Sequence, residues 1–63
     1  DRTNEANSLL GLGRVALQRR EAARAYQHLT RAAAIYRQLG QVDADRRTLE
    51  LLEQVDELGA GEP

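Results

Sequence analysis

Between Leu9 and Ala32 the chain reads LLGLGRVALQRREAARAYQHLTRA. Apolar and small residues recur every three or four positions in the first part of this stretch, which places them along one side of a helix. These residues are Leu9, Leu12, Gly13 and Ala16. The same spacing returns in the second part at Ala25, Leu29 and Ala32. The stretch therefore contains two amphipathic helical faces.

The two faces cannot belong to one continuous helix. Steps of three and four continued beyond Leu17 reach only polar residues, beginning with Arg20 and Glu21, so the second face is out of phase with the first. The chain must turn between Gln18 and Glu21, and two helices joined by so short a connection pack antiparallel. The fold class predicted from this break is all-α, built on a helical hairpin.

Residue size predicts a close contact between the two helices. Small residues in both helices, among them Gly13 and Ala25, leave room for the opposite backbone to approach. Larger side chains are expected to fill the space that remains. These are Leu9, Leu12, Tyr26 and Leu29.

This order of large and small residues resembles the tetratricopeptide repeat, whose pattern begins W-x2-L-G-x2-Y and continues with a small, an aromatic and another small residue. The chain has Leu9, Ala16 and Leu29 where that pattern has Trp, Tyr and Phe. Arg20 occupies the turn where such repeats often carry glycine, and a left-handed conformation there would cost ~1–2 kcal/mol. The resemblance implies a fragment of an α-α superhelix.

Capping signals set the expected helix bounds. The first helix should cover residues 4–18 with Thr3 as its N-cap, and the second should cover residues 21–39 and stop at Gly40. Asp43 then caps a third helix over residues 44–58, which Gly59 ends. The predicted organisation is a helix-turn-helix repeat over residues 1–40, a capping helix over residues 41–58 and a disordered tail over residues 59–63.

The third helix looks like the start of a second repeat that is not completed. Leu49 and Leu52 follow the first two leucines of the motif by forty residues, but Glu53 stands where Gly13 stood. A further helix could not approach that surface as closely. The acidic outer side suits the end of a helical solenoid, because terminal capping elements present polar faces to water.

Composition limits what the chain can be. Its 63 residues form one small domain at most, and with no Cys it has neither disulfides nor thiolate metal ligands. The longest apolar run, residues 32–36, is too short for a membrane-spanning helix. The chain starts at Asp1 without an initiator Met, so we expect a fragment or a processed piece. The family resemblance and the lack of catalytic residues favour the C-terminal end of a larger cytoplasmic protein.

Few residues could support catalysis or metal binding. Ser8 and His28 are the single serine and the single histidine, and a nucleophile needs a base and an orienting group within reach. Arginines flank His28, which disfavours a bound cation, and no second His or Cys completes a metal site. The carboxylates of Glu50, Glu53 and Glu57 are expected to be solvated. We therefore predict a non-enzymatic protein without a cofactor or metal.

A basic stripe gives the alternative function. It consists of Arg20, Arg24, His28 and Arg31, and helix-bound arginines of this kind can neutralise phosphates. A nucleic-acid-binding helical module is therefore the second hypothesis. No aromatic residues interleave the stripe for base stacking, and the acidic third helix offers it an intramolecular partner, so nucleic acid is the less favoured ligand.

The favoured hypothesis is a non-catalytic protein-protein interaction scaffold. In tetratricopeptide proteins the first helix of each repeat lines a concave surface that binds partner peptides, and the resemblance implies the same role here. The expected contact residues for a protein or peptide partner face away from the hairpin interface. They are Asn7, Leu10, Arg14, Leu17 and Gln18 in the first helix, and Arg47, Leu51 and Gln54 in the third.

The isolated chain is also expected to self-associate. Stacked repeats need about three units to bury a continuous core, and this chain supplies fewer. Apolar residues with no internal partner, namely Leu10, Leu17, Leu51 and Ile35, should be open at its surface. Residues 19–40 carry five Arg against one Glu, whereas residues 41–63 carry seven acidic residues against two Arg. This asymmetry predicts a two-fold homodimer.

Overall fold

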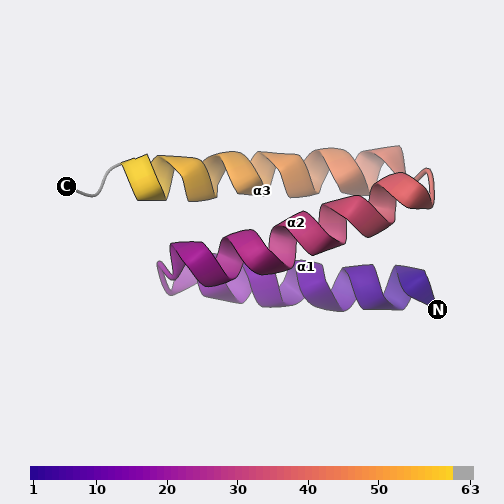
Figure 1. Cartoon of the computed structure of the whole chain (residues 1–63), viewed down its shortest axis with the longest axis horizontal. Coiled ribbons are helices and arrows are strands. Elements are labelled where there is room, and N and C mark those ends of the chain that lie inside the picture. The colour runs from indigo at the N-terminus through magenta and orange to yellow at the C-terminus, as the bar shows by residue number, and fades with distance from the viewer. Residues whose placement is uncertain (61–63) are drawn as a thin grey trace.

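The computed structural model describes residues 1–60 and consists of three helices, with no strand in that part of the chain. Helix α1 spans Arg2–Gln18, α2 spans Ala22–Gln38 and α3 spans Val42–Ala60. Figure 1 shows α1 and α3 running in the same direction, with α2 antiparallel to both. The predicted all-α fold, a hairpin followed by a third helix, is confirmed.

The helix ends differ from the sequence prediction in detail. Helix α1 starts two residues early because Asp1, rather than Thr3, is its N-cap: the Asp1 carboxylate accepts a hydrogen bond of 3.0 Å from the Thr3 amide. Helix α3 continues through Gly59 to Ala60, so the predicted stop at Gly59 is wrong. The rest of the predicted disordered tail, residues 61–63, lies outside the described residues.

The turn between α1 and α2 occurs where the phase break predicts it. The Arg20 amide donates to the Leu17 carbonyl at 3.0 Å, and the Glu21 amide donates to the Ala16 carbonyl at 2.9 Å. This pair of bonds is the Schellman arrangement, in which the residue after the helix adopts a left-handed backbone. Arg20 does so with a φ of 61°, although an L side chain disfavours that conformation.

The turn between α2 and α3 repeats this arrangement twenty residues later. The Gly40 amide donates to the Arg37 carbonyl at 3.1 Å, and the Gln41 amide donates to the Tyr36 carbonyl at 2.9 Å. Gly40 has a φ of 72° and, having no Cβ, meets no steric penalty there. The two turns therefore have the same geometry. They differ in the residue at the left-handed position, because glycine adopts this conformation without strain and arginine does not.

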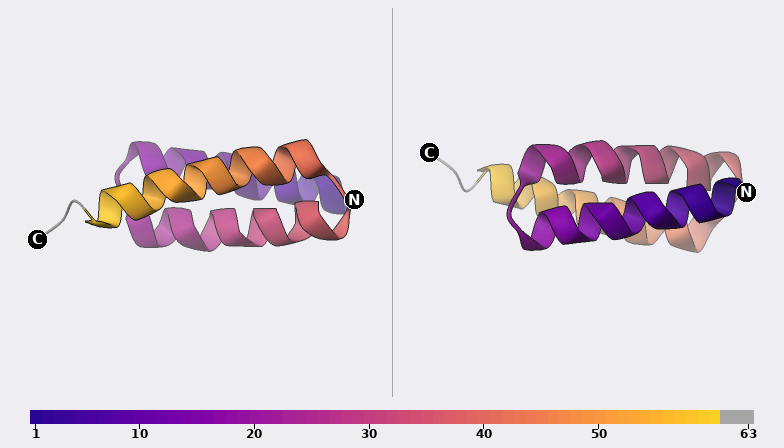
Figure 2. Two further views of the ribbon diagram at one scale, coloured as in Figure 1. Left: turned by 90° about the horizontal axis from the view of Figure 1, so that it is seen from above. Right: turned by 90° about the horizontal axis from the view of Figure 1, so that it is seen from below.

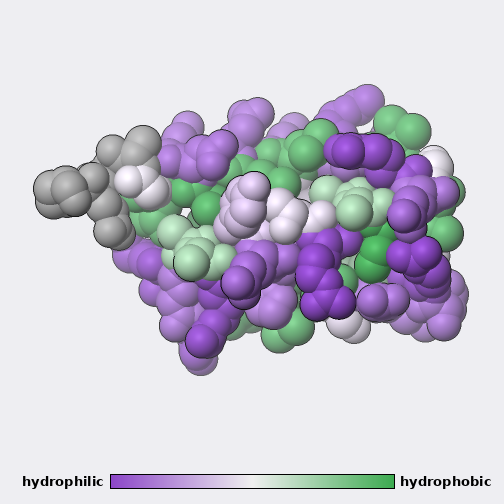
Figure 3. All heavy atoms as spheres, in the orientation of Figure 1, coloured by the Kyte–Doolittle hydropathy of each residue, from purple (hydrophilic) through white to green (hydrophobic). Residues whose placement is uncertain are grey.

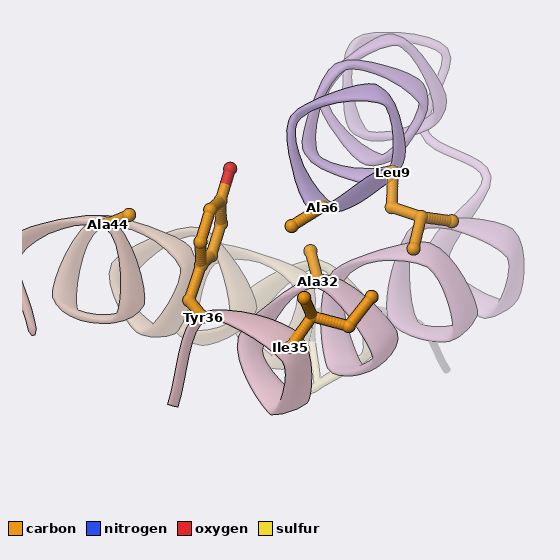
Figure 4. Close-up of a cluster of buried hydrophobic side chains, with 6 residues drawn as sticks. All are labelled: Ala6, Leu9, Ala32, Ile35, Tyr36 and Ala44. Atoms are coloured by element: carbon orange, nitrogen blue, oxygen red, sulfur yellow. The ribbon is translucent and has the colours of Figure 1, made fainter. Parts of the chain in front are cut away.

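Two groups of buried side chains hold the helices together. Figure 4 shows the first, in which Tyr36 rises from α2 between α1 and α3 while small residues pack beside it. This group comprises Ala6, Leu9, Ala32, Ile35, Tyr36 and Ala44. The second lies near the α1–α2 turn and comprises Ala16, Ala25, Leu29 and Val55. All three helices contribute to both groups, but α2 supplies three of the six residues in the first and two of the four in the second, so it is the central helix of the core.

The predicted core is right at most positions and wrong at three. Leu12 and Tyr26 were expected between the helices, but they are 52% and 53% exposed, because one hairpin and one further helix leave each flank of the stack uncovered. Ile35 was expected to be open and is instead 5% exposed, since it packs in the group that contains Ala6 and Leu9. The periodicity of the sequence identified the apolar face of each helix, but not how many neighbouring helices cover that face.

Helices α1 and α2 pack closely at Gly13. A Cβ placed on this glycine would lie 2.5 Å from Cδ2 of Leu29 and 2.6 Å from its Cγ. Leu29 is fully buried and occupies the space that the missing side chain leaves. The small residue at this position is therefore required by packing, as the sequence predicts.

Polar contacts from α1 to the rest of the molecule are concentrated at its N-terminal end. The Gln41 amide nitrogen donates to the Thr3 hydroxyl at 3.0 Å, and the Tyr36 hydroxyl donates to the Asn7 amide oxygen at 2.6 Å. The Arg31 guanidinium lies 3.9 Å from the Glu5 carboxylate. In the described structure, the later turns of α1 are joined to the other helices by apolar packing and by the turn itself.

The views from above and below in Figure 2 show α3 lying across the pair formed by α1 and α2, so that the helices form a short stack. Figure 3 shows the face on which α2 lies nearest the viewer, where hydrophobic residues appear in patches between charged ones. Exposed apolar side chains include Val15, Val42 and Leu49. The faces at the two ends of the stack thus retain apolar surface.

Candidate interaction groove

A groove lies between α1 and α3, and Tyr36 of α2 also lines it. It consists of two adjoining hollows of 240 and 330 Å³ that share the side chains of Arg14, Leu51 and Gln54. The larger hollow lies toward the ends of α1 and α3 and is completed by Leu17 and Gln18. The other is completed by Asn7, Leu10, Tyr36, Arg47 and Glu50. We call the two hollows together the α1–α3 groove.

The structure brings together all of the contact residues predicted from the sequence. All eight of them line the α1–α3 groove. The reason is the shared direction of α1 and α3, which places Asn7 and Arg47, forty residues apart, at corresponding positions of the two walls. Whether these residues bind a partner remains a prediction.

The leucines of the groove are less exposed than expected. Leu10, Leu17 and Leu51 were predicted to be open, but each is half-buried because it packs against the buried groups beneath the groove. One side of each leucine therefore belongs to the core, and the other side lines the groove. They form an apolar floor for a ligand rather than a free hydrophobic patch.

Tyr36 fixes the polar end of the groove. Its ring is 1% exposed, and its hydroxyl donates the 2.6 Å hydrogen bond to Asn7 across the α2–α1 contact. Burial raises the pKa of the Tyr36 hydroxyl above its usual value, and the nearby positive charge of Arg47 opposes this shift. Tyr36, Asn7 and Arg47 therefore meet at one end of the groove, each from a different helix.

The two arginines of the groove differ in ion pairing from three arginines of α2. Within residues 1–60, Arg14 and Arg47 form no ion pair. By contrast, Arg24 lies 3.7 Å from Glu21, and Arg37 lies 3.4 Å from Asp45. The groove thus holds two guanidinium groups that no carboxylate of the described chain neutralises at contact distance.

The basic stripe of α2 has a different environment from the one expected. Its predicted partner was the acidic third helix, but Arg24 pairs with Glu21 in the preceding turn and Arg31 pairs with Glu5 of α1. His28, also in the stripe, is half-buried beside Tyr26. Two of the three arginines proposed to bind nucleic acid are therefore engaged within the hairpin.

Tyr36 is the groove residue that sequence reasoning did not identify. Its side chain is buried between the helices, but it also lines the groove. A tyrosine among alanines on a buried face was the available signal, since a buried hydroxyl needs a hydrogen-bond partner. Glu50 also lines the groove, on the side of α3 that carries Arg47, Leu51 and Gln54.

Residues 1–60 offer neither a metal site nor a membrane span. No group of three or more His, Cys, Asp or Glu residues in that part is arranged to hold a metal ion. None of its three helices combines the length and the apolar character needed to cross a membrane. No protein-family model, curated protein or solved structure matches the chain.

Proposed function

We propose that the chain is a non-catalytic protein-interaction module that holds an extended peptide segment of a partner in the α1–α3 groove. The observation that carries this proposal is the groove itself, in which half-buried leucines form the floor and unpaired polar side chains form the walls. An apolar floor supplies contact area, and a few convergent polar groups supply orientation, as is usual for binding sites.

The module is proposed to be of the tetratricopeptide type, acting as a scaffold within a cytoplasmic protein. The spacing of the motif supports this proposal, as does the close approach at Gly13, where a side chain would collide with Leu29. Ala16, Ala25 and Ala32 are all buried at the positions where the repeat pattern has a packed residue. Residues of α1 and α3 forty positions apart line one surface.

The uncovered ends of the stack support a second contact, with another copy of the chain. Leu12 and Val15 on one flank, and Val42 and Leu49 on the other, are large apolar side chains that stay at least two-fifths exposed. Contiguous apolar surface of this kind commonly marks an interface. We therefore propose weak homodimerisation of the isolated chain through these ends, which leaves the groove free.

A selection for peptide ligands tests the groove. Random octapeptides displayed on phage are selected against the immobilised chain, and the enriched peptides are then tested on two variants. Leu51→Asp places a charge on the groove floor, whereas Leu49→Asp places the same charge on the outer side of α3. We expect Leu51→Asp to abolish binding and Leu49→Asp to retain it.

Circular dichroism establishes that both variants remain helical, so that lost binding is not lost folding. Peptides that bind the two variants equally well would place the interaction site outside the groove. The proposed function would be contradicted if the selection enriched no peptide whose binding is lost in Leu51→Asp.

A further inference from the structure

We infer that α2 binds a short segment of single-stranded nucleic acid on its solvent side, where Arg24 and Arg31 contact phosphates and one base stacks on the ring of Tyr26. We call this surface the outer face of α2, and Gln27 completes it. It shares no residue with the α1–α3 groove. The binding of a nucleic acid here is therefore independent of a peptide ligand in the groove.

Two adjoining hollows lie along the outer face of α2. The first has a volume of about 440 Å³ near the start of the helix, and Arg24 and Gln27 help to line it. The second has a volume of about 390 Å³ and shares Gln27 with the first. Its other lining residues are Tyr26, His28, Thr30 and Arg31. Each hollow therefore has one arginine, and a side-chain amide lies between them.

The arginines of this face stay accessible in the folded chain. Arg24 lies 3.7 Å from Glu21 and Arg31 lies 3.9 Å from Glu5, but each arginine side chain is about two-thirds exposed. Ion pairs on the surface contribute little to stability, so a phosphate can replace either carboxylate. Arg20, also exposed, forms no ion pair within residues 1–60. Three arginines against two carboxylates leave this side of α2 basic.

Tyr26 supplies the aromatic ring that we expected the basic stripe to lack. The sequence predicted that Tyr26 packs between the helices, but it is 53% exposed and lines the same hollow as Arg31. Along the helix it lies between Arg24 and Arg31. Any base can stack on an exposed aromatic ring, and a single strand offers the faces of its bases whereas a duplex keeps them stacked. The ring between two guanidinium groups therefore favours a single strand.

The spacing of the arginines indicates the length of the bound segment. Arg24 and Arg31 are seven residues apart on one helix, which separates them by ~10 Å along its axis. A stacked strand rises ~3.4 Å per nucleotide, so the two arginines span about three nucleotides. Gln27 lies between them and offers both a donor and an acceptor to a base edge. Because the whole chain has a net charge of −1, the attraction is confined to this face and the bound segment is short.

An acidic peptide is the other anionic ligand that this face could attract. The cores of protein interfaces are usually apolar, whereas interfaces with nucleic acids are more polar and more positively charged. No leucine, isoleucine or valine lines either hollow of the outer face. The side chains of a peptide would therefore find little apolar surface here, while a base and its phosphates find a ring and two guanidinium groups.

Fluorescence anisotropy on the full chain tests the inference. The probe is a fluorescein-labelled oligothymidylate of about eight nucleotides. Three ligands of matched length are compared with it: a DNA duplex, a phosphodiester chain without bases, and polyglutamate. We expect the oligothymidylate to bind more tightly than all three. A plot of the logarithm of its affinity against that of the salt concentration should have a slope of about −1.4 for two phosphate contacts.

Variants separate the contribution of charge from that of stacking. Arg24→Gln and Arg31→Gln should each make the salt slope shallower by about 0.7, because one phosphate contact is lost. Tyr26→Ala should weaken binding about fivefold to a hundredfold with the slope unchanged, and Tyr26→Phe should restore the affinity because it restores the ring. The chain without bases should bind equally to wild type and to Tyr26→Ala.

Arg46→Gln is the matched control for charge. It removes one arginine from an exposed position of α3 that lines neither the outer face of α2 nor the groove, and it should leave the salt slope unchanged. Circular dichroism establishes that every variant remains helical.

Three outcomes would overturn the inference. The first is that the oligothymidylate shows no saturable binding at low salt. The second is that Tyr26→Ala binds it as tightly as wild type, which would leave only a general attraction to phosphates. The third is that polyglutamate binds as tightly as the oligothymidylate, which would make this face a protein-binding surface. None of these outcomes affects the proposed groove, because the variants lie outside it.

Discussion

At the scale of single residues, Arg20 lies on the surface and has an unfavourable backbone conformation. It adopts a φ of 61° in a turn whose hydrogen bonds match those around Gly40, where φ is 72°. A side chain in this conformation costs roughly 1–2 kcal/mol, offset in part by the greater freedom of an unfolded glycine. Arg20→Gly should therefore stabilise the fold by about 1 kcal/mol, measured by thermal or urea unfolding.

The equivalent turn supplies the control for this prediction. Gly40→Arg introduces the same residue at the same conformation and should destabilise the fold by about 1 kcal/mol. If Arg20→Gly lowers the melting temperature while Gly40→Arg leaves it unchanged, backbone strain at Arg20 is not the source of the effect.

Gly13 and Gly11 lie in the same helix but differ in their surroundings. Nothing lies within 4 Å of a Cβ at Gly11, whereas one at Gly13 would collide with Leu29. Gly11→Ala should stabilise α1 by about 1 kcal/mol through helix propensity alone. Gly13→Ala gains the same propensity but overpacks a buried site, at about 1–3 kcal/mol, and should be destabilising overall.

Urea unfolding of the two alanine variants gives the comparison directly. Stabilisation by both would show that Leu29 moves aside without cost, and that the close approach at Gly13 is not needed for packing. Equal destabilisation by both would point instead to a general intolerance of α1 to substitution.

The sequence predicts some of these local features but not others. The small size of Gly13 and the poor fit of Arg20 to its turn follow from the sequence because each depends on its own helix and one neighbour. The exposure of Leu12 and Tyr26 does not, since it depends on how many helices cover the hairpin. The N-cap was misplaced from Asp1 to Thr3 because both residue types cap helices and the pattern does not distinguish them.

At the scale of helices, Tyr36 ties the central helix to both walls of the groove. A raised pKa means that the folded state holds the hydroxyl proton more tightly than the unfolded chain does. The resulting stability is complete below the unfolded pKa of about 10 and is lost as the pH rises through the folded value. Chemical unfolding should therefore show stability falling above about pH 10.

Substitution identifies the group responsible for that fall. Tyr36→Phe should lose about 0.5–1.5 kcal/mol near neutral pH, because the bond to Asn7 is gone, and should lose less stability than wild type in alkali. Tyr26→Phe removes a half-exposed hydroxyl and should retain the alkaline fall. An identical pH dependence in wild type and Tyr36→Phe would show that another group titrates.

The arrangement of helices was largely predictable, and the groove followed from it. A phase break and one glycine locate both turns, and a repeat distance of forty residues places the contact residues of α1 and α3 on one surface. The depth of that surface was not predictable. It depends on how far Leu10, Leu17 and Leu51 sink into the core, which periodicity does not report.

At the scale of the whole molecule, the exposed ends of the stack predict self-association. Sedimentation equilibrium should show a mass above 7.0 kDa that rises with concentration, with a melting temperature that rises in parallel. Leu12→Glu and Leu49→Glu should each reduce the association without unfolding the chain, because both side chains are already about half-exposed. A constant mass of 7.0 kDa over a wide concentration range would reject the dimer.

The uneven distribution of polar contacts along α1 has a mechanical consequence. Side-chain hydrogen bonds and an ion pair hold Thr3, Glu5 and Asn7 at one end of this helix, whereas its last turns are held by apolar packing and by the α1–α2 turn. Apolar contacts have no fixed direction, whereas hydrogen bonds do. A bulky ligand is therefore expected to displace side chains between Gln18 and Gln54 more readily than those at Asn7 and Arg47. The end of the groove at Asn7 and Arg47 then sets the stricter requirement on the chemistry of the ligand.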